Sequence, residues 1–135
     1  MNKFSALCVA SMLGLMTVAM SCNNGTNPTP TPPGPLQLLQ PVAGATFKVG
    51  SPVTVQWKIN DTTQVNLVEV DLSLDGGNTF PELLMGLGGH GFPIDTLEMT
   101  WLPTTTEVST KCVIKVHQYD ATEPYDKSKL FSVTN

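Results

Sequence analysis

The sequence has 135 residues, enough for one domain of ordinary size. Acidic residues outnumber basic ones by eleven to seven, which gives a net charge of −4, and every basic residue is a lysine. A protein that binds nucleic acid needs clustered cationic side chains, so this composition argues against that class of partner.

The first 21 residues are typical of a secretory signal. Lys3 supplies a positive charge, and residues 4–20 form an uncharged apolar run, slightly short for a membrane span of about 20 residues. Residues 19–22, Ala-Met-Ser-Cys, resemble a bacterial lipobox, in which a small residue precedes the cysteine that receives the lipid. The resemblance implies that Cys22 carries diacylglycerol and becomes the mature N-terminus. The alternative is an ordinary signal peptide cleaved near Ser21, with Cys22 a free thiol.

Lipidation of Cys22 would decide where the mature protein resides. Two or three acyl chains anchor firmly, because each buried methylene adds about 0.8 kcal/mol. The mature chain would have six lysines against eleven acidic residues, a net charge of −5, so contact with the membrane is expected through the lipid and not through basic side chains. Asn23 stands where an aspartate resembles an inner-membrane retention signal of enteric bacteria. We therefore expect a location at the bacterial outer membrane.

Residues 22–35 are rich in proline, threonine and asparagine and hold nothing to bury. Proline blocks helices and sheet ladders, so this segment is predicted to be a disordered, extended tether of about 3 Å per residue. A proline-rich recognition site is the alternative interpretation. The chain is thus expected to comprise a signal peptide at 1–21, a tether at 22–35 and a folded domain at 36–135.

The rest of the chain shows the two-residue period of β-strands. In the clearest run, Val68, Val70, Leu72 and Leu74 alternate with Glu69, Asp71 and Ser73. The alternation predicts one dry face and one solvent-exposed face. Further strands are expected at 36–39, 46–49, 53–59, 82–85, 97–101, 111–118 and 129–133, a returning arm at 79–80, a glycine-rich loop at 86–93 and an acidic loop at 119–126.

About seven short strands with turn residues between them and no helical period are typical of an all-β fold, the immunoglobulin-like (Ig-like) antiparallel β-sandwich. In such a sandwich Trp57, Leu72 and Ile114 are expected to meet in the shared interior. Trp101 is expected in or near the same space.

Five stretches resemble known Ig-like families. GATFKVGSPVTVQWKI (44–59), VEVDLSLDGGNTF (68–80), MTWLP (99–103), KCVIKV (111–116) and LFSV (130–133) are similar to Ig-like modules of secreted bacterial proteins. They are also similar to the N-terminal Ig-like domain of fungal cell-wall beta-glucan-assembly proteins. The resemblance implies an accessory domain with no established ligand.

A second resemblance is local. Residues 73–80, Ser-Leu-Asp-Gly-Gly-Asn-Thr-Phe, are similar to the Asp-box of sialidase-like propellers, a hairpin brace remote from catalysis. The chain is too short for a propeller, so only the local turn is implied. In that turn Asp75 would accept hydrogen bonds from amides, Gly76 and Gly77 would adopt open backbone angles, and Phe80 would pack.

Candidate site residues are few. The acidic loop holds Asp120, Glu123 and Asp126 together with Tyr119 and Tyr125. These carboxylates could bind calcium or simply be solvated, or the loop could form a sugar-binding rim, for which Tyr119, Tyr125 and Phe92 are the candidate aromatics. His90 and His117 lack the spacing of a zinc site.

The pattern predicts no catalytic group and no cofactor. Cys112 is in step with Ile114 and is expected in the core, with His117 on the opposite face of the strand. Glu69 and Asp71 are neighbours on a face expected to be solvent-exposed, unlike the facing carboxylates of glycosidases. No nucleophile–base pair is visible.

These observations favour a lipid-anchored, non-enzymatic envelope protein whose Ig-like domain serves adhesion, scaffolding or partner binding. One alternative is a carbohydrate-binding accessory module for cell-wall or plant polysaccharide, which would need exposed aromatic side chains. Another is a catalytically inert subunit of an enzyme complex.

Overall fold

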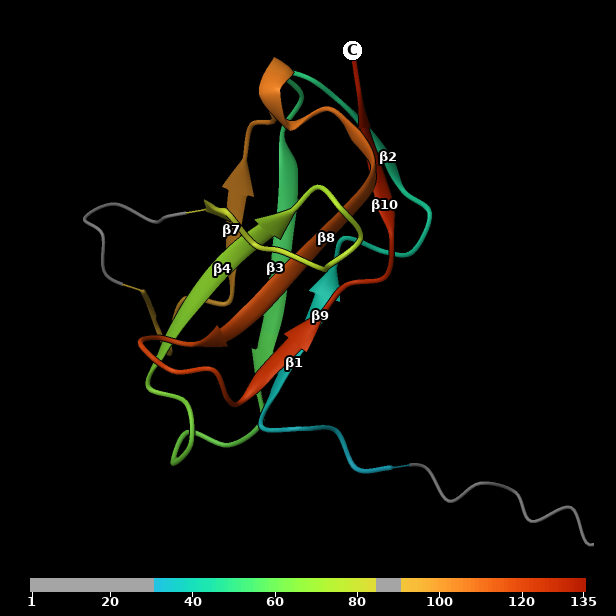
Figure 1. Cartoon of the computed structure of the whole chain (residues 1–135). Coiled ribbons are helices and arrows are strands. Elements are labelled where there is room, and N and C mark those ends of the chain that lie inside the picture. Colours follow the sequence, from blue (N-terminus) through green and yellow to red (C-terminus); the bar gives the residue numbers. More distant parts are fainter. Residues whose placement is uncertain (1–30, 85–90) are drawn as a thin grey trace, which may run out of the picture. The chain divides into compact units, whose positions relative to one another are not determined.

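Two β-sheets form the part of the chain that the computed structural model describes, residues 31–84 and 91–135 (Figure 1). One sheet has three strands in the order β1–β3–β7. The other has seven, with β2–β10–β8–β4–β5 in a row, β6 paired with β4 and β9 paired with β8. The strands are β1 (Leu36–Gln40), β2 (Thr46–Lys48), β3 (Val53–Ile59), β4 (Leu67–Ser73), β5 (Glu82–Leu83), β6 (Phe92–Pro93), β7 (Glu98–Trp101), β8 (Ser109–Gln118), β9 (Tyr125–Lys127) and β10 (Phe131–Thr134).

The chain crosses repeatedly from one sheet to the other. It passes from β1 to β2, back to β3, on to β4, back to β7 and on to β8. Such crossing between layers, in place of pairing between neighbours in sequence, is typical of Ig-like sandwiches. The predicted all-β sandwich is therefore confirmed. One pair departs from the antiparallel arrangement, because β2 and β10 run parallel with Phe47 opposite Val133.

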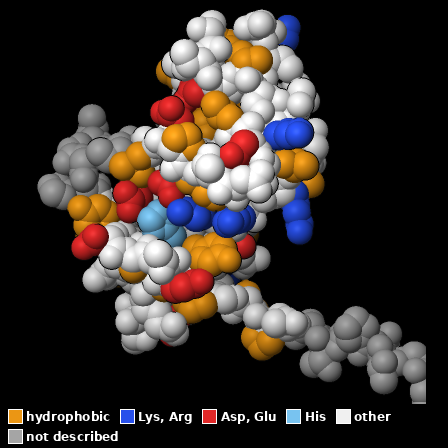
Figure 2. Space-filling view, in the orientation of Figure 1, with side chains coloured by type: hydrophobic (Ala, Val, Ile, Leu, Met, Phe, Trp, Pro, Cys, Tyr) orange, Lys and Arg blue, Asp and Glu red, His pale blue; other side chains and the backbone are white. Residues whose placement is uncertain are grey.

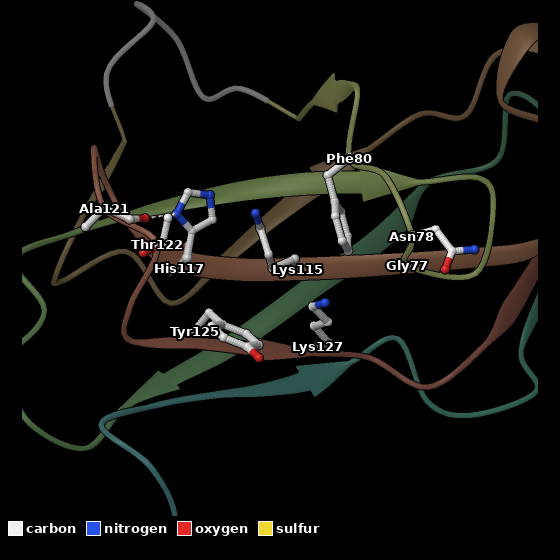
Figure 3. Close-up of a pocket in the computed structure, with 9 residues that line it drawn as sticks. All are labelled: Gly77, Asn78, Phe80, Lys115, His117, Ala121, Thr122, Tyr125 and Lys127. Atoms are coloured by element: carbon white, nitrogen blue, oxygen red, sulfur yellow. Dashed lines mark hydrogen bonds between the residues drawn. The ribbon is translucent and has the colours of Figure 1, made fainter.

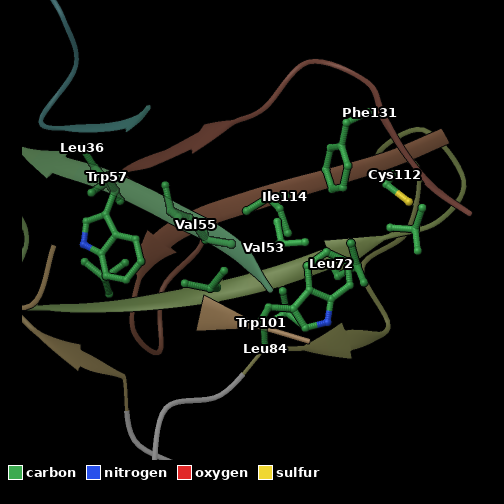
Figure 4. Packing of buried hydrophobic residues seen from close by; sticks show 14 of the residues in the cluster. Leu36, Val53, Val55, Trp57, Leu72, Leu84, Trp101, Cys112, Ile114 and Phe131 are labelled. Atoms are coloured by element: carbon green, nitrogen blue, oxygen red, sulfur yellow. The ribbon is translucent and has the colours of Figure 1, made fainter. Parts of the chain in front are cut away.

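The inward faces of β3, β4 and β8 build the core (Figure 4). Trp57 on β3 is 1% exposed, and Leu72 and Ile114, which lie opposite each other on β4 and β8, are fully buried. These three side chains share one interior, as the alternation predicted. At the other end of the core the Trp101 ring meets the Phe131 ring edge-on, with centroids 6.5 Å apart.

Two short strands occupy segments that were predicted as loops. Phe92–Pro93 forms β6 against β4, and Tyr125–Lys127 forms β9 against β8. Neither is long enough to show a two-residue period; each forms because a longer strand offers unpaired backbone groups beside it. The connection before β8 likewise contains a one-turn 3-10 helix, η1 (Thr105–Glu107), and Leu97, expected in the strand, is exposed just before β7 begins.

The outward face of β4 is not the solvent-exposed face that the alternation predicted. Asp71 is only 9% exposed and Ser73 is fully buried. Alternation reports which residues share a face, but not what covers that face. Here the loop after β4 and the side chains of β8 cover it, and this is where the candidate site lies.

Several predictions concern residues outside the described part of the chain. These are the signal peptide, Cys22, most of the predicted tether, His90 and most of the glycine-rich loop. Within residues 31–84 and 91–135, no helix has the length and apolar character needed to cross a membrane.

Candidate ligand-binding site

Strand β8 lies between β4 and β9, and the outward side chains of the three strands form two rows. In one row Asp71, Lys115 and Lys127 stand side by side. In the next row Glu69, His117 and Tyr125 do the same. Side chains directly opposite each other on paired strands lie about 5 Å apart at Cβ, so both rows are in contact range. Figure 2 shows the histidine beside lysine and acidic side chains in a recess of this face.

Asp71 binds two cationic side chains with one oxygen. Its Oδ2 accepts hydrogen bonds from Lys115 Nζ at 2.7 Å and from His117 Nε2 at 3.0 Å. Burial would raise the pKa of Asp71, but the hydrogen bonds from His117 and Lys115 outweigh burial and hold this pKa below its ordinary value of 3.8. Asp71 is therefore ionised at neutral pH.

His117 is held as an imidazolium by its surroundings. Its Nδ1 lies 3.0 Å from the carbonyl oxygen of Gln118 and 2.9 Å from that of Ala121, and a carbonyl can only accept, so Nδ1 bears a proton. Its Nε2 faces the ionised Asp71 and lies 3.7 Å from Glu69 Oε2. The hydrogen bond to Asp71 raises the pKa of His117 although burial acts in the opposite direction.

The turn after β4 folds back over the outward face of β8, where Gly77 lies beside Val113. Asp75 Oδ1 accepts from the backbone N–H groups of Asn78 and Thr79, both at 3.0 Å, and from Ser73 Oγ at 2.6 Å. These bonds, that from Ser73 foremost, lower the pKa of Asp75. Gly77 has a φ of +88°, and its backbone N–H donates to Ser73 Oγ at 2.8 Å. The expected roles of Asp75 and the glycines are confirmed.

This turn delivers Phe80 to the two lysines. The Phe80 ring centroid lies 4.8 Å from Lys115 Nζ and 5.0 Å from Lys127 Nζ. Like charges opposite each other destabilise a sheet, and the face of an aromatic ring attracts cations, so Phe80 helps to hold the two ammonium groups together. Lys127 Nζ also lies 5.4 Å from the Tyr125 ring centroid. No carboxylate of a described residue comes within ion-pair distance of Lys127.

These groups surround a hollow of about 350 Å³ (Figure 3). It is lined by Gly77, Asn78, Phe80, Lys115, His117, Ala121, Thr122, Tyr125 and Lys127. In Figure 3 Phe80 and Tyr125 frame the hollow from the turn and from β9, with the lysines between them. Three cations face two carboxylates here, so the site has a local charge of about +1 in a protein of net charge −4. Its chemistry suits an anion that also presents a surface for an aromatic ring.

The aromatic residues singled out from the sequence do not gather at one place. Tyr125 is 45% exposed and lies in the hollow. Phe92 is half-buried and packs on Trp57, with ring centroids 5.4 Å apart. Tyr119 is half-buried, and its backbone N–H donates to the Leu67 carbonyl at 2.9 Å.

The acidic residues of the loop also do not act together. Asp126 Oδ2 accepts from the Leu38 backbone N–H at 2.8 Å, which ties β9 to β1 of the other sheet. Asp120 has a φ of +55° and is exposed, as is Glu123. Among the described residues no group of three or more His, Cys, Asp or Glu side chains is placed to hold a metal ion.

Sequence reasoning missed the centre of the site. It treated Asp71 as a solvent-facing carboxylate, expected Phe80 only to pack in the turn, and left His117, Lys115 and Lys127 without a role. A signal for this site was present in the sequence. On the face away from the core, β4 carries acidic residues and β8 carries basic residues, in each case at alternate positions. Cys112, in contrast, lies in the core as expected, where burial raises the pKa of its thiol.

Comparison with known proteins gives little to set beside this geometry. No protein-family model and no curated protein matches the chain. Among solved structures, fibronectin(III)-like modules of CbhA from Clostridium thermocellum are similar at a TM-score of 0.41 and 16% identity, over 73% of this chain and 94% of that chain. A likeness this distant carries no argument about function, so the proposals below stand on the residues described above.

Proposed function

We propose that this protein is a non-catalytic binding module, anchored in a bacterial envelope membrane by lipid on Cys22, that takes its ligand in the hollow between Phe80 and Tyr125. The observation that carries the proposal is the position of Lys127. This cation lies beside two aromatic rings on a face of the sandwich, without a carboxylate partner among the described residues. A charge left available in a shaped recess is typical of a binding site.

The state of His117 supports a binding role over a catalytic one. Both ring nitrogens lie within hydrogen-bonding distance of acceptors, so neither has a free lone pair with which to act as a general base. Cys112 points to the other side of β8, into the core, and cannot reach His117. His117 and Cys112 therefore do not form a nucleophile–base pair.

Binding to the envelope tests this function. We expect the full chain, kept with its lipid anchor in non-ionic detergent throughout, to be retained by detergent-washed envelope fractions, and retention to be lost in the double variant Lys127→Glu, Tyr125→Ala. Lys58→Glu is the matched control, because Lys58 is an exposed lysine on β3 of the other sheet. Equal retention of the double variant, or no retention of the wild type, would refute the proposal. Prior protease digestion of the fraction distinguishes a protein partner from a polysaccharide.

Anchoring requires a separate measurement. Mass spectrometry of the mature N-terminus should find Cys22 as the first residue, with a mass increase that matches diacylglycerol and further acyl groups. An unmodified Cys22, or cleavage at another residue, would remove both the anchor and the expected outer-membrane location. The binding function of the domain would be unaffected by that result.

A polysaccharide ligand is the second candidate, favoured by the exposed ring of Tyr125. Under this alternative the domain is an accessory that brings the chain to cell-wall or plant polymers. Adhesion or scaffolding through a protein partner would instead leave binding sensitive to protease treatment of the envelope fraction.

A further inference from the structure

The charge balance of the hollow selects for a ligand with one negative charge. Lys115 and His117 are both held by Asp71, with Glu69 close to the histidine, so these four groups nearly neutralise one another. Among the described side chains around the hollow, Lys127 is the cation that remains. A single ammonium suits a monoanion, whereas a dianion would bring a second charge towards Asp71 and Glu69 without compensation.

The hollow also provides a stacking surface and a polar rim. Tyr125 presents an aromatic ring at its wall, and the negative face of such a ring attracts polarised C–H groups. Asn78 uses its amide nitrogen and its backbone N–H within the turn, and its side-chain oxygen has no donor among the residues that the structure describes. Thr122 adds an exposed hydroxyl. A ring with C–H groups on one face and hydroxyls at its edge matches this lining.

The size of the hollow and the strand edge beside it argue against an extended peptide as the ligand. A volume of about 350 Å³ is at the lower end for ligand pockets and fits one or two sugar units. A peptide bound to a sandwich commonly adds a strand to an open sheet edge. The outer edge of β9, beside the hollow, is only three residues long and lies next to β1, whose Leu38 N–H donates to the Asp126 side chain (Figure 1).

From these observations we infer that the hollow binds a sugar unit with one negative charge, either a carboxylate or a sulfate ester, with the charge at Lys127 and the ring on Tyr125. This ligand assignment rests on the proposed binding function. It names the chemistry that the binding site would recognise in an envelope or plant polymer.

Calorimetric titration of the full chain in non-ionic detergent tests the assignment. The probes are methyl glucuronide, the uncharged methyl glucoside, a sulfate ester of glucose, and acetate. We expect the glucuronide or the sulfate ester to bind at least about tenfold more tightly than the glucoside, since a charge-assisted hydrogen bond is lost with the charge. Which of the two binds more tightly identifies the source of the charge. Added salt should weaken that binding.

Variants locate the binding. Lys127→Gln should weaken binding of the charged sugar about tenfold. Tyr125→Ala should weaken binding of the sugars and leave the affinity for acetate unchanged. Lys58→Gln should change nothing. Circular dichroism of each variant checks the fold, which surface substitutions at exposed positions should preserve.

The outcomes separate this inference from the function on which it rests. Equal affinity for the glucoside and both charged sugars, or unchanged affinity in Lys127→Gln, would overturn the ligand class. If the sugars fail but envelope fractions still retain the wild type and not the double variant, the ligand class is wrong and the binding function stands. If retention fails as well, both are wrong.

Discussion

Gly77 shows how one residue shapes the candidate site. Its φ of +88° allows the chain to reverse over β8 and bring Phe80 to the lysines. A Cβ at this position would lie 3.7 Å from Val113 Cγ1, which is ordinary contact. Space is therefore available, and the cost of a side chain lies in the backbone conformation.

We expect Gly77→Ala to destabilise the fold by about 1–2 kcal/mol, the cost of placing an L-residue with a side chain in the left-handed region. Urea unfolding measures it. Gly34→Ala is the control, because Gly34 does not adopt a positive φ and a Cβ there would meet only the Leu36 carbonyl at 3.7 Å. Equal effects of the two substitutions would show that the turn does not need glycine.

The pair of Asp71 and His117 makes stability depend on pH in a defined direction. Folding raises the pKa of His117 above 6.5. Its contribution to the free energy of unfolding is therefore complete below pH 6.5 and is lost as the pH rises through the pKa of the folded state. Folding lowers the pKa of Asp71 below 3.8, so its contribution is complete above that pH and is lost as the pH falls through the folded value. The pair stabilises most between these limits.

Urea unfolding at a series of pH values from below to well above 6.5 should show wild-type stability falling as the pH rises through the folded pKa of His117. In His117→Gln that fall should be smaller, because the glutamine does not titrate. His90→Gln, the same substitution at the other histidine, serves as control. An identical pH dependence in the wild type and His117→Gln would mean that the imidazolium does not stabilise the fold.

Strand β3 illustrates how an element is stabilised by the face it buries. Val53, Val55 and Trp57 point inward, while Thr54 and Lys58 point to solvent. Trp57→Ala should cost about 3–5 kcal/mol, because it removes a large buried ring and leaves a cavity. Thr54→Ala on the exposed face should stay within about 0.5 kcal/mol. Denaturant unfolding compares them, and a loss below about 1 kcal/mol for Trp57→Ala would contradict the central place of this residue.

The pairing of β9 with β8 decides which side chains β9 contributes to the site. Tyr125 enters the hollow only because the β9 segment pairs with β8 and places Tyr125 opposite His117. Asp126, one residue on, points the other way and binds the Leu38 N–H of β1. One three-residue strand thus supplies both a wall of the site and a tie between the sheets.

At the scale of the whole molecule, the closed sandwich isolates Cys112. Its side chain is fully buried, and burial raises the pKa of its thiol, so the reactive thiolate is disfavoured. In a chain with Cys8→Ser and Cys22→Ser, Cys112 should resist thiol reagents in native buffer and react once denaturant unfolds the domain. Rapid stoichiometric labelling in native buffer would contradict this packing.

The sequence by itself determined the fold class, the inward faces and the turn at Asp75. Alternation along Val53–Ile59 and along β8 is a local property, because successive side chains of a strand point to opposite sides. The turn is equally local, since Asp75 binds residues within four positions of itself. For the same reason it was possible to assign His117 and Cys112 to opposite faces of one strand.

Only the tertiary structure decided the candidate site. Asp71 and His117 are 46 positions apart and meet through the register between β4 and β8. Lys127 and Phe80 approach through a paired strand and a folded-back turn that no periodicity reveals. Register, and what covers an outward face, are set by packing across the whole sandwich, so the charges could be read from the sequence but their partners could not.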